Sequence, residues 1–142
     1  MPEEIHSRPD ITAALARGVT RMLIEHGLAT LLEVPLANGR RADVMGLSQQ
    51  GEIWIVETKS CFEDYAVDAK WPDYLEYCDR FFFAVTEHFP RELVPAEVGL
   101  IVADGFGGAI LRGAPTRPLN AARRKAVTLS FARLAALRLS YS

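Results

Sequence analysis

Apolar residues near the start of the chain recur every three or four positions between Ile11 and Leu23. This spacing places them on one face of a helix, so the pattern predicts a helix over residues 11–26. Asp10 is positioned to cap the first turn, and Gly27 is the residue type that most often ends a helix.

Three strand-like segments follow, at residues 29–36, 41–47 and 52–59. Asn38-Gly39 is a strong hairpin signal between the first two, and the polar residues 48–51 predict a second tight turn. Pro35 places the first segment at a sheet edge or at a strand end, because proline has no N–H to donate. The expected unit is an antiparallel meander of three strands.

The segment after residue 60 has two interpretations, because Pro72 does not fit the interior of a continuous helix. Either a loop leads to a short helix that starts near Trp71, or one longer helix carries a kink. Both interpretations place four residues on one face: Trp71, Tyr74, Leu75 and Cys78. At this spacing Trp71 and Tyr74 are expected in the core rather than as a platform for stacked nucleic acid bases.

The second half of the chain predicts three more strands and a long final helix. Residues 80–86 are almost entirely apolar, which is typical of a central strand buried on both faces. The remaining elements are expected over residues 98–103, 109–112 and 119–138. This order predicts an α/β fold with a mixed central β-sheet flanked by α-helices, in a single domain spanning residues 1–142.

Composition excludes some classes of protein. Of the 142 residues, 49% are hydrophobic and 24% charged, and no apolar run approaches the ~20 residues that a membrane-spanning helix needs. The first ten residues are polar and acidic, unlike a secretory signal, so we expect a cytoplasmic location. Cys61 and Cys78 have no CxxC spacing, so they predict neither a zinc site nor a disulfide framework.

The charged residues are distributed unevenly along the chain. All 18 acidic residues lie at or before Asp104, whereas seven of the 16 basic residues follow it. A basic terminal segment on an acidic domain often contacts a polyanion. The alternative is that these arginines pair with the domain's own carboxylates.

The most informative chemical pattern is Asp43 on the second predicted strand, followed by Glu57 and Lys59 at the end of the third. Alternate residues of a strand share a face, so Glu57 and Lys59 point the same way. A turn centred near residue 50 places Asp43 opposite Glu57. The backbone carbonyl of Thr58 lies between them and could become a third ligand if the strands separate there.

Two adjacent carboxylates repel each other, and a hard divalent cation relieves the repulsion. We therefore expect Mg²⁺, with Mn²⁺ as a substitute, at Asp43 and Glu57. Lys59 would stabilise negative charge that develops on a phosphate or orient a water. No His or Cys accompanies the acids, which argues against zinc. The alternative is a plain Glu57–Lys59 ion pair on the sheet surface.

This layout resembles the PD-(D/E)XK nuclease superfamily, in which Asp43 matches the Asp and Glu57-Thr58-Lys59 the Glu-x-Lys. Five segments extend a closer resemblance to MmcB-type bacterial DNA repair proteins over most of the chain: GRRADVMGL, VETKS, DAKWPDYLEYCDRFFFAV, GLIVADG and ARRKA. The resemblance implies a restriction-endonuclease-like core, with a hairpin and a C-terminal helix added. It also implies a DNA partner and a Mg²⁺-dependent endonuclease that acts in repair.

Alternatives remain open at this stage: a DNA-binding repair accessory protein that does not cut, or an interaction domain with no role on DNA. Nucleases of this type often pair to cut both strands, so the resemblance also allows a homodimer. An upstream acid is common in the superfamily, and the candidates are Glu33 and Glu25. Glu33 is favoured, because a lone carboxylate in an apolar run is costly unless it is paired or binds metal.

Basic side chains near these segments are candidates for contact with DNA phosphates. They are Arg40, Arg41, Lys70, Arg123, Arg124 and Lys125. Asp64 and Asp68 could line the same site, although helix capping and solvation explain them equally well.

Overall fold

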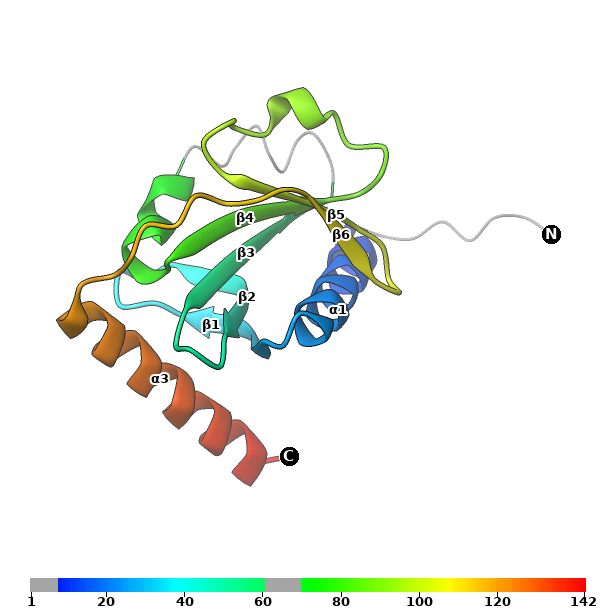
Figure 1. Ribbon diagram of the computed structural model, residues 1–142. Helices are drawn as coiled ribbons and strands as arrows, with labels where there is room; N and C mark the ends of the chain where they lie inside the picture. The colour runs from blue at the N-terminus through cyan, green and yellow to red at the C-terminus, as the bar shows by residue number, and fades with distance from the viewer. Residues whose placement is uncertain (1–7, 61–69) are drawn as a thin grey trace.

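The protein is seen here as a computed structural model that describes residues 8–60 and 70–142 (Figure 1). Its centre is one mixed sheet of six strands in the order β1 to β6. The strands are β1 (Ala29–Pro35), β2 (Arg41–Leu47), β3 (Ile53–Lys59), β4 (Arg80–Val85), β5 (Gly99–Ala103) and β6 (Gly108–Arg112). The predicted α/β fold with a mixed sheet is confirmed.

Strand directions follow from the connections. The strands β1, β2 and β3 form the antiparallel meander, β4 and β5 run parallel to β3, and β6 returns antiparallel to β5. The strand β4 is central and almost wholly buried, as its apolar sequence predicted. The strand β1 lies at the sheet edge and ends at Pro35, so both predicted positions for this proline are correct.

Glycines end the first helix and close the first hairpin. Gly27 has φ 87°, and the N–H groups of Gly27 and Leu28 donate to the carbonyls of Ile24 and Leu23. These two hydrogen bonds form a Schellman motif, which satisfies carbonyls in the last turn of the helix. Gly39 has φ 86° in the turn between β1 and β2, which a side chain would strain.

Helix α1 (Arg8–Glu25) covers one face of the sheet (Figure 1). Its apolar stripe, which includes Leu15, Val19 and Leu23, packs on the residues of β2 to β5 that point to that side. They include Val44, Val56, Phe82 and Ile101. The predicted cap at Asp10 is wrong, because α1 already begins at Arg8. Asp10 lies within the first turn, where its negative charge is favourable near the helix N-terminus.

The opposite face is covered by η1, a 3-10 helix (Trp71–Tyr77), and by α3 (Ala121–Ser140). Pro72 lies in the first turn of η1, which agrees with a short helix starting near Trp71. The segment that would distinguish this from a kinked helix lies outside the described residues. A second short 3-10 helix, η2 (Arg91–Leu93), lies between β4 and β5.

The aromatic residues of η1 belong to the core, as expected. Tyr74 and Trp71 stack on Phe81, with ring centroids 5.6 and 6.2 Å away. The four residues predicted to share a face all pack in the cluster beneath η1 and α3. Core packing, rather than stacking with nucleic acid bases, therefore explains these two side chains.

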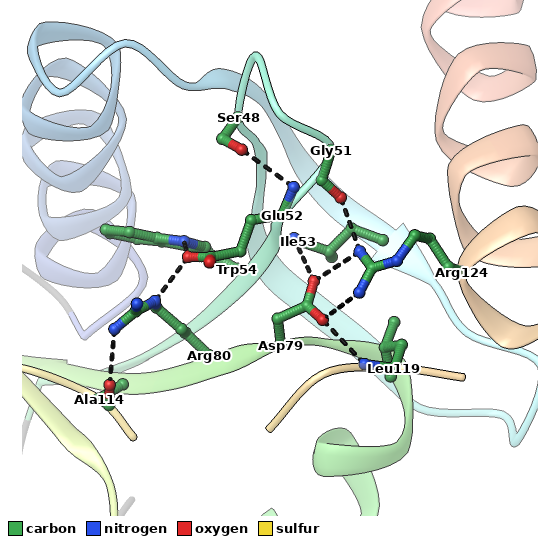
Figure 2. Close-up of polar contacts among 10 residues, drawn as sticks. All are labelled: Ser48, Gly51, Glu52, Ile53, Trp54, Asp79, Arg80, Ala114, Leu119 and Arg124. Carbon is green, nitrogen blue, oxygen red and sulfur yellow. Dashed lines mark hydrogen bonds and ion pairs between the residues drawn. The ribbon is translucent and has the colours of Figure 1, made fainter. Parts of the chain in front are cut away.

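Asp79, just before β4, joins α3 and the β2–β3 turn to the sheet (Figure 2). Its carboxylate, 2% exposed, accepts hydrogen bonds from the N–H groups of Ile53 and Leu119 and two from the Arg124 guanidinium, at 2.5 and 2.9 Å. Arg124 also donates to the carbonyl of Gly51. Burial alone would raise the pKa of Asp79, but these donors outweigh it and lower the pKa.

Within the described part of the chain, none of the helices has the length and apolar character needed to cross a membrane.

Candidate functional site

Asp43 and Glu57 meet where the ladder between β2 and β3 is interrupted. The last paired residues are Val44 and Val56, and the same register continued would place Asp43 opposite Glu57. Beyond this pair, backbone N–H groups donate to side-chain carboxylates instead of to carbonyls of the neighbouring strand. The Asp43 N–H donates to Oε1 of Glu57 at 2.9 Å, and the Thr58 N–H donates to Oδ2 of Asp43 at 2.8 Å. The predicted register is confirmed, and the backbone pairing of β2 with β3 ends at Val44 and Val56.

Thr58 holds the Asp43 carboxylate twice, because its hydroxyl also donates to Oδ2 at 3.1 Å. In an extended strand the N–H and C=O of one residue point to the same side. The Thr58 carbonyl therefore lies on the side of β3 that faces Asp43. These hydrogen bonds use one oxygen each of Asp43 and Glu57 and fix the direction of both carboxylates.

Glu57 is buried, with 4% of its surface exposed. Burial, followed by the negative charge of Asp43, raises its pKa to about 9, and the nearby positive charge of Lys59 opposes the shift. At neutral pH the pair therefore holds a proton in place of a second negative charge. A cation between the two carboxylates would stabilise their charged forms, so Glu57 would release its proton when the cation binds.

Lys59 ends β3 two residues beyond Glu57. Glu57 and Lys59 pair with Phe83 and Val85 on β4, and both of these belong to the cluster beneath η1 and α3. Since paired residues of parallel strands share a face, Glu57 and Lys59 point to that side too. The sequence-based expectation that Glu57 and Lys59 share a face is confirmed.

The donor set fits a hard divalent cation. Two carboxylates and one backbone carbonyl are oxygen ligands of the kind that Mg²⁺ prefers, and one or two carboxylates usually suffice because waters and phosphate oxygens complete the shell. Within residues 8–60 and 70–142, no group of three or more His, Cys, Asp or Glu side chains is arranged to hold a metal. Asp43 and Glu57 are the two acidic side chains that the geometry brings together.

Comparison with known proteins gives a family. The model of the MmcB-like family, described as DNA repair protein MmcB-like, matches residues 2–142. This chain belongs to that family. The resemblance inferred from five segments of sequence is thereby confirmed, and the protein is a member of a DNA repair family.

Two solved structures are similar to this family member. A protein of unknown function from Silicibacter pomeroyi is 52% identical, with a TM-score of 0.86 over 88% of this chain and 86% of that one. A repair endonuclease from Pyrococcus abyssi is 22% identical, with a TM-score of 0.40 over 65% of this chain and 43% of that one. None of the curated proteins matches this chain.

The two candidates for an upstream acid lie in different places in this MmcB-like protein. Glu25 is exposed in the last turn of α1. Glu33 occupies the position of β1 that matches Asp43 in the register, although these two residues are not paired. The Glu33 side chain is 67% exposed and lies 3.9 Å from the Arg41 guanidinium. Of the two, Glu33 is the one beside Asp43, and its role as an acid of the site stays a prediction.

The basic candidates are engaged to different degrees. Arg40 forms an ion pair with Asp73, and Arg123 lies over the Tyr77 ring at 4.6 Å. Arg124 pairs with buried Asp79, so this arginine follows the alternative in which basic residues of the tail pair with the domain's own carboxylates. Three side chains are exposed: Arg41, Lys70 and Lys125.

Two residues with clear structural roles were not singled out from the sequence. Asp79 carries a weak signal, because it is an acidic residue directly before an apolar strand, where burial requires partners. Arg138 donates to the carbonyls of Leu32 and Glu33, which lie more than 100 positions earlier. Nothing local in the sequence marks that contact. The predicted site residues Asp64 and Asp68 lie outside the described residues.

Proposed function

We propose that this protein is a Mg²⁺-dependent endonuclease that hydrolyses phosphodiester bonds of DNA during repair. The observation that carries the proposal is the pairing of Asp43 with Glu57, where one carboxylate is buried with a pKa of about 9. Membership of a DNA repair family supports DNA as the substrate. A buried carboxyl with a strongly raised pKa beside a second acid is a recognised signature of a functional site.

Asp43, Glu57 and the carbonyl of Thr58 would hold the cation. When bound, Mg²⁺ supplies positive charge for the phosphate and lowers the pKa of a water. The hydrogen bonds from Thr58 orient Asp43, and the Asp43 N–H orients Glu57, so the two carboxylates are fixed before substrate arrives. Mn²⁺ should substitute, because it accepts the same oxygen ligands.

Lys59 would act on the phosphate. Its position on the same face as Glu57 places an ammonium group beside the acids, where it stabilises charge that develops on the phosphate oxygens. It could also orient the attacking water. Glu33 would complete the site as an additional acid, since it lies at the register position beside Asp43.

DNA would contact exposed basic side chains around this site. Arg41 and Lys70 are the nearest along the chain, and Lys125 extends the surface onto α3. Arg40 and Arg123 could contribute by exchanging their present partners for phosphates, whereas Arg124 would have to leave buried Asp79. Cutting both strands of a duplex would require two copies of the site, as in a homodimer.

A second candidate function follows if the two acids hold Mg²⁺ without supporting efficient cleavage. In that case the protein would bind DNA as a repair accessory and would not cut it.

A gel assay on duplex, nicked, flapped and single-stranded DNA, with Mg²⁺, Mn²⁺ or a chelator, separates the two functions. The endonuclease predicts metal-dependent products that Asp43→Ala and Lys59→Ala each abolish, while both variants keep most of the DNA affinity. DNA binding without products on every substrate would support the accessory role. No DNA binding at all would leave an interaction domain.

A further inference from the structure

Glu33 has an unusual backbone conformation for its residue type. Its φ is 50°, and it is the one non-glycine residue with positive φ within the described part of the chain. A side chain in this left-handed region clashes with the backbone, so the surrounding structure must hold it there. Glu33 also falls at an interruption of the ladder, between two residues of β1 that are paired with β2.

Arg138 supplies the holding contact. From the last turn of α3 its guanidinium donates one hydrogen bond to the carbonyl of Leu32 and another, of 2.7 Å, to the carbonyl of Glu33. Two donors on one planar group fix the relative direction of two consecutive carbonyls. A left-handed turn at Glu33 sets that direction, so the contact stabilises this turn specifically.

The matching position of β2 is Asp43, where the strand changes face. Ala42 and Met45 both belong to the cluster beneath α3, although they are three residues apart, while Val44 belongs to the cluster beneath α1. Regular alternation would put Ala42 and Met45 on opposite faces. The irregularity therefore falls at Asp43, whose carboxylate reaches the Thr58 N–H of the neighbouring strand.

We propose that Arg138 is a positioning residue for the acid pair, because it holds the left-handed turn at Glu33 that lets Asp43 reach across to Thr58. This inference rests on the proposed function for its consequence, since the site served is the metal site. The C-terminal helix thereby controls a site on the far side of β1 without contributing a ligand to it.

Amide hydrogen exchange tests the inference without metal. In Arg138→Ala we expect exchange of the Thr58 N–H to rise about tenfold relative to the Phe83 N–H of central β4, because the Asp43 acceptor is no longer held in place. Arg133→Ala, also on the exposed surface of α3, is the matched control and should change neither amide. A rise that is equal at Thr58 and Phe83 would mean general destabilisation and would overturn the inference.

The proposal that Arg138 acts through the backbone conformation of Glu33 is tested by repeating Arg138→Ala in an E33G background. Glycine adopts positive φ without a side-chain clash, so the turn no longer needs the arginine. The effect of Arg138→Ala on the Thr58 N–H should then largely disappear. An effect of equal size in both backgrounds would overturn this proposal, because the two residues would be acting independently.

Mn²⁺ affinity is the second readout. We expect Arg138→Ala to weaken Mn²⁺ binding by about tenfold, as for other residues that orient metal ligands, and to do so far less in the E33G background. If the wild-type protein binds no Mn²⁺, the proposed function fails, while the exchange measurement still decides the inference. If Arg138→Ala does not fold, Arg138→Lys keeps the charge but not the two-pronged donor, and should show a smaller rise at Thr58; no rise would overturn the inference.

Discussion

The main-chain N–H of Asp43 donates a 2.9 Å hydrogen bond to the side chain of Glu57, on the neighbouring strand. Thr58 completes the arrangement by donating to the Asp43 carboxylate from both its N–H and its hydroxyl. Glu57 is thus oriented by the main chain of Asp43, and Asp43 is oriented by Thr58, the residue that follows Glu57. A structural ion pair between Glu57 and Lys59 would need none of these contacts, which is why the arrangement favours a ligand-binding role.

Glu57→Gln should change how stability depends on pH. The folded protein keeps the Glu57 proton up to about pH 9, whereas the unfolded chain releases it near the ordinary pKa of 4.5. Wild-type stability therefore falls as pH rises through this window, and glutamine removes that fall. The free energy of unfolding of the variant, measured with urea, should gain on wild type by up to about 1.4 kcal/mol per pH unit.

Glu92→Gln is the matched control, because Glu92 is exposed in η2. A gain of the same size in Glu92→Gln would contradict the assignment of the effect to Glu57. If the stability curves of Glu57→Gln and wild type are parallel from pH 5 to 8, Glu57 does not carry the raised pKa on which the site depends.

Arg124→Ala should destabilise the protein strongly at neutral pH. It leaves the Asp79 carboxylate, which is 2% exposed, without its charged partner, and such losses cost about 3 kcal/mol. The pKa of Asp79 is lowered below its ordinary value of 3.8, so the contribution is present at neutral pH and is lost as pH falls through that region. Chemical unfolding at pH 7 and at pH 3 should show a large and then a smaller penalty.

Lys125→Ala, at the neighbouring position of α3, should affect DNA binding rather than stability. Lys125 is exposed on α3, so its removal should change stability by no more than about 0.5 kcal/mol. DNA affinity should fall, and the slope of log K against log salt should decrease by about one. An unchanged salt slope would remove Lys125 from the proposed DNA-binding surface.

Gly18→Ala should separate α1 from the β5–β6 hairpin. A Cβ at Gly18 would lie 1.7 Å from the Asp104 carbonyl oxygen, which backbone cannot move aside cheaply. We expect a loss of roughly 2 kcal/mol or more in the free energy of unfolding. Gly107→Ala is the control, since nothing lies within 4 Å of its Cβ. Equal stability of the two variants would contradict this close contact.

Local patterns in the sequence were sufficient to predict most of the fold. Asn38-Gly39 and the turn near residue 50 set the register of the meander, and that register places Asp43 across from Glu57. The apolar run of β4 predicted its central position. The start of α1 was predicted wrongly, because a helix can begin before an acidic residue as readily as at it.

Long-range contacts could not be predicted in this way. The pair Asp79–Arg124 and the contact of Arg138 with β1 join residues that are 45 and more than 100 positions apart. The left-handed turn at Glu33 is held by that distant arginine, so no local propensity signals it. The sequence therefore indicated which acids come together, and the structure showed what orients them.

The most direct test of the metal site is a crystal of the protein grown with Mn²⁺, measured at an X-ray energy where manganese scatters anomalously. The proposed function predicts an anomalous peak within ligand distance of the Asp43 and Glu57 carboxylates, and its loss in Asp43→Ala. A well-ordered site without a peak there, at Mn²⁺ concentrations that support DNA cleavage, would contradict it.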